Sequence, residues 1–257
     1  MTDRTTPRLV LHFGGNGHAS VRLDGARGAL GRRAGAPALF DVPYPGFEGR
    51  PSSPGLGAFL DSTAHSYRAV EASAVAGYAS GVGALVALSL RARGELSGLP
   101  LVFQGPVLWG LERRRFPRLM TACPPARRLL QRVFTLAAFQ DRFLRTQFRR
   151  PITGSARARF FEGYARCPAF GDFFGWFTPG WLRSLERQFA LRPSGLAGVT
   201  VWLGGLDRVV GPPEVEATAR ALGVRWPVVR FPDWGHYPMI DEPEEWADAL
   251  CESLAPR

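Results

Sequence analysis

Residues 74–91 place a turn of small residues between two apolar runs, and this pattern constrains the fold more than any other segment of the chain. Residues 74–78 are short, apolar and strand-like, and 81–90 have the composition of an apolar helix. The turn reads Gly-Tyr-Ala-Ser-Gly over 77–81, with Ala79 at its centre. Small residues two positions on either side of a sharp turn let the chain pass closely there. The segment therefore predicts a buried strand, a tight turn and a buried helix.

Strands and helices alternate along most of the chain. Most of the expected strands are continuous apolar runs, which is typical of a parallel sheet covered by helices on both faces. We therefore predict an α/β fold with a mostly parallel central sheet flanked by helices. The expected strands are 9–12, 36–40, 73–78, 99–103, 200–203 and 227–231, and the expected helices are 57–70, 82–91, 213–222 and 243–254.

Residues 107–190 interrupt this alternation with dense arginine and aromatic residues. We interpret them as a helical cap inserted into an α/β core that comprises 1–106 and 191–257. In open α/β sheets, ligands bind outside the carboxyl ends of the strands. The cap would therefore form the roof of a binding pocket.

Composition limits the function classes. The 257 residues fit one sizeable domain, and the formal net charge is +10 with 32 basic side chains, all of them arginine. That bias is typical of a GC-rich bacterial genome, so it gives little support to nucleic-acid binding. The 3 cysteines suggest neither a disulfide framework nor a zinc site. We see no signal peptide and no membrane span, and expect a soluble cytoplasmic protein.

Two further loops carry side chains suited to acid–base chemistry. Asp207 follows the expected strand 200–203, and His236 lies in a glycine-bearing loop after the strand 227–231. A carboxylate just past a strand end can be held rigidly against an imidazole. Together with the turn at Ala79, they appear in the chain order nucleophile position, acid, base. Glu112 and Asp233 are alternative acids, but neither is as well placed after a strand.

On these residues the chain resembles the α/β-hydrolase fold family from about Leu9 to Leu254. The motifs that carry the resemblance are Gly-Tyr-Ala-Ser-Gly at 77–81, the glycine-bearing Asp207 segment 204–212 and the His236 segment 235–245. The proline- and glycine-rich loop 41–49 is also similar to one in the family. The cap resembles those of the esterase, lactonase, thioesterase and epoxide-hydrolase-like branch. The resemblance implies a helical cap after the sixth strand, a nucleophile elbow and a catalytic triad.

The family's roles are then carried over to matching positions. His236 would be the general base and later the general acid, and Asp207 would orient it. The backbone N–H of Ser80 would donate to the oxyanion, together with the N–H of Gly14 or Gly15. No cofactor and no metal are implied.

Ala79 departs from the family pattern, because a methyl group cannot attack a carbonyl. Three explanations stay open. A native serine could have been replaced by alanine in the laboratory. The chain could be a natural catalyst without a nucleophile, or a binding protein without activity. Ser80 could instead be the nucleophile, although that frame puts Tyr78 and Val82 where small residues are needed.

We expect an enzyme of the serine-hydrolase family, here inactive in acyl transfer, that acts on an ester, thioester or lactone with an apolar or aromatic acyl part. The alternatives are a cyclase, decarboxylase, lyase or cofactor-independent oxygenase of secondary metabolism, and a non-catalytic binding protein. The partner would be a small apolar molecule, or an acyl-carrier or coenzyme A thioester, and not nucleic acid. The side chains expected to line the pocket are Phe13, Tyr78, Trp109, Phe173, Phe174, Trp176 and Phe177. His12, His18 and His65 show no partner pattern, and we interpret them as structural or surface residues.

Overall fold

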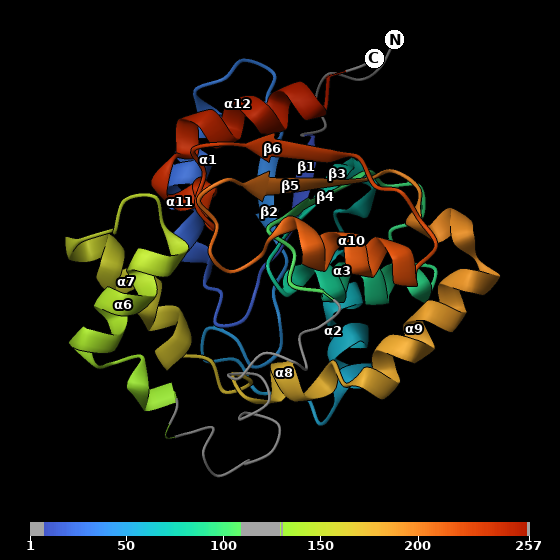
Figure 1. Cartoon of the computed structure of the whole chain (residues 1–257), viewed down its shortest axis with the longest axis horizontal. Helices are drawn as coiled ribbons and strands as arrows, with labels where there is room; N and C mark the ends of the chain where they lie inside the picture. Colours follow the sequence, from blue (N-terminus) through green and yellow to red (C-terminus); the bar gives the residue numbers. More distant parts are fainter. Residues whose placement is uncertain (1–7, 109–128, 130, 256–257) are drawn as a thin grey trace.

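A six-stranded parallel sheet forms the centre of the molecule (Figure 1). The computed structural model describes residues 8–108, 129 and 131–255, apart from the side chains of Phe173 and Phe174. Because every neighbouring pair of strands is parallel, all carboxyl ends lie at one edge of the sheet. In spatial order the strands are β2 (Ala38–Asp41), β1 (Leu9–Phe13), β3 (Ala74–Ser80), β4 (Leu101–Gln104), β5 (Val199–Gly204) and β6 (Val228–Phe231).

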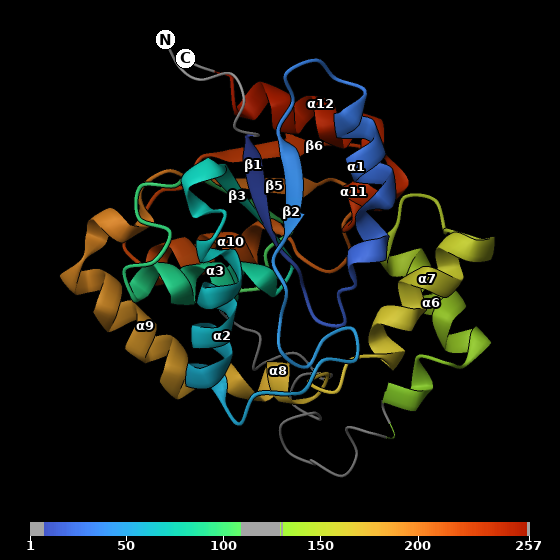
Figure 2. The same cartoon turned by 180° about the vertical axis from the view of Figure 1, so that it is seen from behind.

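Helices cover both faces of the sheet, as Figures 1 and 2 show from opposite sides. One face packs against the larger apolar core and the other against a smaller one. This arrangement confirms the predicted α/β fold. The larger core is covered by α2 (Leu56–Arg68), α3 (Gly83–Ala92), α9 (Pro179–Leu191) and α10 (Pro212–Ala221), and the smaller by α1 (Asp24–Gly31), α11 (Pro238–Asp241) and α12 (Pro243–Ser253).

Side chains alternate between the two cores along each central strand, as the pleat of a strand requires. In β3, Ala76 and Tyr78 belong to the smaller core, whereas Ala79 belongs to the larger one. Alternation therefore places Ser80 on the side of the smaller core. The register sets Ser80 beside Gln104 of β4.

The inserted helices lie between β4 and β5. Those in the described part of this segment are α6 (Ala137–Gln147), α7 (Gly154–Ala165), α8 (Asp172–Trp176) and α9. In the described part of this chain the insertion follows the fourth strand, not the sixth. Figure 1 shows α6 and α7 at one side of the sheet, while α9 contacts α3 of the core layer. Within the described residues, no helix is long and apolar enough to cross a membrane.

The expected strand 73–78 is wrong at its carboxyl end, since β3 continues to Ser80. The helix α3 accordingly begins at Gly83, one residue later than expected. The turn thus lies at 81–82, immediately outside the sheet. This shift of two residues changes which residue stands in the turn.

Candidate active site

His236 and Asp207 form a buried hydrogen-bonded pair at the carboxyl edge of the sheet. The Nδ1 atom of His236 lies 2.8 Å from Oδ2 of Asp207, and their side chains are 4% and 0% exposed. The other carboxylate oxygen of Asp207 accepts hydrogen bonds from the N–H groups of Val209 (2.7 Å) and Val210 (3.0 Å). Two backbone donors and the imidazole thus fix the carboxylate, as the sequence pattern predicted for the loop after this strand.

Burial disfavours the ionised Asp207 carboxylate, but three contacts outweigh it. The nearby charge of His236, its hydrogen bond and the two backbone N–H groups hold the pKa of Asp207 below its ordinary value. An ionised Asp207 accepts the Nδ1–H of His236, so the lone pair of a neutral imidazole is on Nε2. The pair therefore presents a base on the Nε2 side of the ring.

Backbone contacts fix the His236 loop from two directions. The N–H of His236 donates to the carbonyl of Gln147, at the end of α6, over 2.7 Å. Gly105, just after β4, leaves space beside the pair, because a Cβ there would stand 2.8 Å from Oδ2 of Asp207 and 2.9 Å from Nδ1 of His236. The inserted helices and the sheet edge thus both position the imidazole.

Gly81 is the residue of the turn that faces the base. A Cβ added to Gly81 would stand 3.5 Å from Nε2 of His236, its one neighbour within 4 Å among the described residues other than those adjacent in the chain. Gly81 has φ +55°, in the left-handed region that a nucleophile elbow requires of its central residue. The N–H of Gly81 donates to the carbonyl of Gln104, and its own carbonyl accepts from Val107.

Ala79 does not occupy this place. It lies inside β3, paired with Phe13 of β1 and Phe103 of β4, and its methyl is buried in the larger core. A serine oxygen at 79 would enter that apolar core on a side chain that does not face His236. We therefore correct the predicted nucleophile position from Ala79 to Gly81, and the idea of a serine replaced at 79 loses its geometric basis.

The small residues around Gly81 have separate packing reasons. A Cβ at Gly83 would stand 2.1 Å from the carbonyl oxygen of Phe13, so only glycine lets α3 begin this close to the end of β1. A Cβ at Gly77 would stand 2.6 Å from a methyl of Leu101. Gly77 thus serves strand packing, and the small residues two positions on either side of Gly81 are Ala79 and Gly83.

The glycine turn after β1 lies against the elbow. A Cβ at Gly15 would stand 3.2 Å from the carbonyl oxygen of Ser80 and 3.8 Å from the nitrogen of Val82. Ser80 is the last residue of β3 and precedes Gly81. The amide that follows the elbow residue is therefore that of Val82, at the N-terminus of α3.

Solved structures match this arrangement over nearly the whole chain. A haloalkane dehalogenase from Bradyrhizobium elkani has a TM-score of 0.64 at 18% identity, over 98% of this chain and 91% of its own. An alpha/beta hydrolase fold protein from Burkholderia ambifaria has a TM-score of 0.65 at 17% identity, over 96% and 90%. A bacterial membrane phospholipase A has a TM-score of 0.62 at 18% identity, over 98% and 79%.

The chain has the α/β-hydrolase fold. No protein-family model and no curated protein matches its sequence. The TM-scores show the α/β-hydrolase architecture, whereas identities below 20% leave the chemistry open.

Within this α/β-hydrolase fold, the side chains predicted to line a pocket lie in different surroundings. Phe13 and Tyr78 are fully buried in the two apolar cores, so they do not line an open pocket. Trp176 packs against Phe59 of α2, and Phe177 against Trp181. Trp109 lies outside the described residues, as do the side chains of Phe173 and Phe174.

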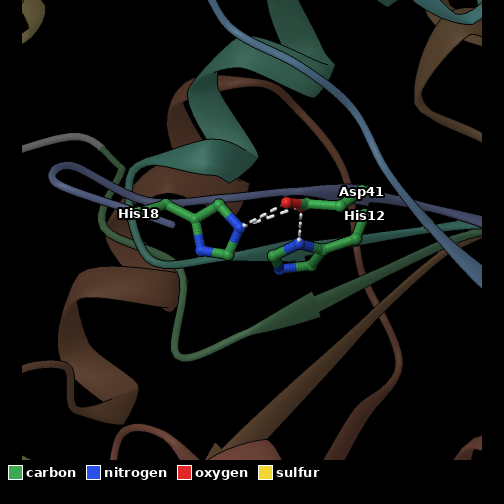
Figure 3. A group of neighbouring side chains, drawn as sticks. All are labelled: His12, His18 and Asp41. Carbon is green, nitrogen blue, oxygen red and sulfur yellow. Dashed lines mark hydrogen bonds and ion pairs between the residues drawn. The ribbon is translucent and has the colours of Figure 1, made fainter. Parts of the chain in front are cut away.

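A second polar cluster, which the sequence analysis missed, lies beside the glycine turn. His12 and His18 both bond to the carboxylate of Asp41, as Figure 3 shows. Nε2 of His12 lies 3.3 Å from the hydroxyl of Ser80. The sequence did carry a signal for this cluster. Asp41 directly follows the expected strand 36–40, and His12 ends the expected strand 9–12, just before the glycine turn.

Proposed function

We propose that this protein is an acid–base enzyme in which His236, oriented by Asp207, acts without a nucleophilic side chain. The proposal rests on the position of Gly81, which has the backbone conformation expected of an elbow residue and lies next to Nε2 of His236. A glycine leaves the space of a serine side chain to water or to a substrate group. No acyl-enzyme can then form at this position.

The reaction that fits this arrangement best is direct hydrolysis of an ester, thioester or lactone. Nε2 of His236 takes a proton from water as the water oxygen attacks the carbonyl carbon. The resulting imidazolium then gives a proton to the leaving oxygen or sulfur, which restores the neutral base. Asp207 stabilises the imidazolium between the two steps.

Two amide groups are suited to hold the developing oxyanion. In the elbow frame centred on Gly81, the donors are the N–H of Val82 and that of Gly14 or Gly15, with Val82 replacing Ser80. The closeness of Gly15 to the Val82 nitrogen supports this pairing. Such a donor stabilises the transition state by about 3 kcal/mol in comparable sites.

The absence of a side chain at Gly81 also favours a second candidate reaction, proton removal from a carbon acid. With a carbon acid as substrate, the same base would remove a proton from carbon and the same amides would stabilise an enolate. A cyclase, decarboxylase, lyase or cofactor-independent oxygenase would use the site in this way. An apolar or aromatic substrate, including a carrier-bound or coenzyme A thioester, fits either candidate.

A pair of elbow variants tests the absence of a covalent step. Gly81→Ser places an oxygen beside Nε2 of His236, whereas Gly81→Ala adds the same Cβ and the same backbone strain, about 1–2 kcal/mol, without the oxygen. We expect a fluorophosphonate probe to label Gly81→Ser but neither Gly81→Ala nor the wild type. Peptide mapping of the labelled protein identifies the modified residue.

Turnover of p-nitrophenyl and thioester substrates tests the base. We expect His236→Ala to lower kcat by about 10²–10⁴-fold in the wild-type background, and Asp207→Asn to lower it in the same direction. Labelling of the wild type at Ser80 would contradict the proposal, as would turnover that survives His236→Ala. Absence of ester turnover together with base-dependent turnover of a carbon acid would select the second candidate.

A further inference from the structure

His12, His18 and Asp41 bring three metal-ligating side chains together from three segments. His12 lies near the end of β1, His18 follows the glycine turn, and Asp41 ends β2. Nδ1 of His12 is 2.7 Å from Oδ1 of Asp41, and Nε2 of His18 is 2.9 Å from each carboxylate oxygen. Figure 3 shows both imidazoles converging on one carboxylate.

From this convergence we propose that His12, His18 and Asp41 bind one divalent transition-metal ion of the zinc class. Two imidazole nitrogens and one carboxylate are a common ligand set for zinc and related ions. The three ligand atoms lie within 4.8 Å of one another. Ligands of tetrahedral zinc stand about 3.3 Å apart, so side-chain shifts of about 0.5–1.5 Å per pair suffice.

The surroundings of His12 are those of a ligand with a fixed ring. The residue is fully buried, and its ring stacks on Tyr78 with centroids 5.6 Å apart. Its second nitrogen, Nε2, lies 3.3 Å from Oγ of Ser80. A histidine that binds a metal through one nitrogen needs such a partner for its other N–H. Ser80 supplies an acceptor oxygen at that place.

A small cavity lies beside His18, and its described lining includes neither His12 nor Asp41. Its volume is about 10 Å³, close to what one water molecule needs. The cavity is lined by Asn16, His18 and Ser80, and Oδ1 of the buried Asn16 has no hydrogen-bond partner among the described residues. Three protein ligands leave the fourth position of zinc to water, and Asn16 could accept a hydrogen bond from it.

The charges near the cavity permit a cation. Asp41 supplies a carboxylate that both imidazoles contact, at 2.7 Å from Nδ1 of His12 and 2.9 Å from Nε2 of His18. Arg22 also lines the cavity, but its Nε donates to the carbonyl of Phe160 over 3.0 Å. This hydrogen bond holds the guanidinium against the α7 backbone but does not neutralise it, so a bound cation would rely on the Asp41 carboxylate to offset the Arg22 charge.

Metal binding would exchange two hydrogen bonds for coordination. Each imidazole turns its N–H toward Asp41, so each must bind the ion in its other tautomer. The Nδ1 lone pair of His12 then binds the ion while its Nε2–H donates to Ser80. His18 binds through Nε2 and carries its proton on Nδ1, and any imidazolium releases one proton.

Calorimetric titration with Zn²⁺ tests the site on full-length protein without a histidine tag, after treatment with a chelator. We expect one equivalent to bind the wild type, and His18→Ala to weaken the affinity at least about tenfold. Ser80→Ala should weaken it by about 10–100-fold through the loss of the second partner of His12. Co²⁺ should give the visible absorption of a four-coordinate site in the wild type and lose it in His18→Ala.

Two variants at histidines outside the proposed metal site serve as controls. His65→Ala removes an exposed imidazole from α2, and His236→Ala removes the candidate base; both should keep wild-type affinity. The side chain of His18 is 11% exposed, and circular dichroism verifies that His18→Ala folds. No binding to the wild type, unchanged binding by His18→Ala, or loss of binding in His236→Ala would each overturn the proposal. None of these outcomes bears on hydrolysis at Gly81.

Discussion

At the scale of single residues, two overlapping patterns of small residues compete for the elbow. Gly77, Ala79, Gly81 and Gly83 are all small, so either Ala79 or Gly81 can stand at the centre of a five-residue frame. The sequence does not separate the frames, because both satisfy the need for small residues two positions away. The structure separates them by backbone conformation, since Gly81 has φ +55° and Ala79 lies in a strand.

Gly83 offers a stability test of the assigned frame. Gly83→Ala puts a Cβ 2.1 Å from the carbonyl oxygen of Phe13, which forces α3 away from β1. We expect a loss of about 1–3 kcal/mol in the free energy of unfolding, or a failure to fold, because the core is overpacked. Urea denaturation followed by tryptophan fluorescence measures it.

Gly57→Ala is the matched control for Gly83→Ala. Gly57 also lies in the first turn of a helix, α2, and an added Cβ there would have no described residue beyond its immediate surroundings within 4 Å. Replacing it should stabilise the protein by about 0.5–1 kcal/mol. Equal effects of the two substitutions would show that the backbone of Gly83 is not confined as the structure has it.

The pairing of Asp207 with His236 was predictable because each follows an expected strand. The structure places the two side chains 2.8 Å apart. Asp41 and His12 were not paired in advance, because nothing in the sequence says that β1 and β2 are neighbours in the sheet. Contacts across the sheet depend on strand order, which local patterns do not encode.

At the scale of elements, the alternation of strands and helices located the long helices but not the strand ends. The expected helix 243–254 became α12, Pro243–Ser253, whereas β3 ran two residues past its expected end. Tyr78 and Ser80 alternate with Gly77 and Ala79, so both faces of β3 are buried and no polar boundary marks where it stops. The short α11 was missed altogether, since four residues carry no helical period.

The contact between α6 and α11 should depend on pH. Asp241, at the end of α11, accepts from the N–H of Arg149 over 2.8 Å, just past α6. Burial, with a smaller contribution from the charge of Glu242, raises the pKa of Asp241 to about 6. The folded state thus binds more protons than the unfolded state between about pH 4 and 6. The contribution of Asp241 to stability falls as pH rises through this range.

Asp241→Asn tests this sign. An asparagine keeps an acceptor for the Arg149 N–H without the charge. The free energy of unfolding of the variant should therefore rise relative to that of the wild type between pH 4 and 6, by at most about 3 kcal/mol. Above pH 6 the difference between the two proteins should be constant. Urea denaturation across pH 4.5–8 measures the difference. Asp233→Asn, an exposed substitution with the same charge change, is the control. A difference that is constant over the whole range would refute the raised pKa.

At the scale of the whole molecule, α1 and α12 join distant parts of the chain over one face of the sheet. The two helices contact each other, and both views place them side by side (Figures 1 and 2). Arg33, just past α1, pairs with Glu244 at 2.9 Å and with Asp248 at 2.6 Å, and Arg32 also bonds to Glu244. Beneath these ion pairs, Trp246 of α12 is fully buried against Tyr78.

The apolar core, and not the ion pairs, should hold this face together. Trp246→Ala removes a fully buried indole and should cost about 3–5 kcal/mol in the free energy of unfolding. Glu244 is 54% exposed, so water and salt screen its charge, and Glu244→Ala should change stability far less, with the remaining effect vanishing at high ionic strength. Urea denaturation of both variants at low and high salt compares the two contributions.

A larger effect of Glu244→Ala would mean that surface charges align α12 on the sheet, and that the packing of Trp246 follows from them. Such a result would also change the view of His236, because α11 and α12 continue directly from its loop, and a face held by ion pairs would make the position of the base depend on salt.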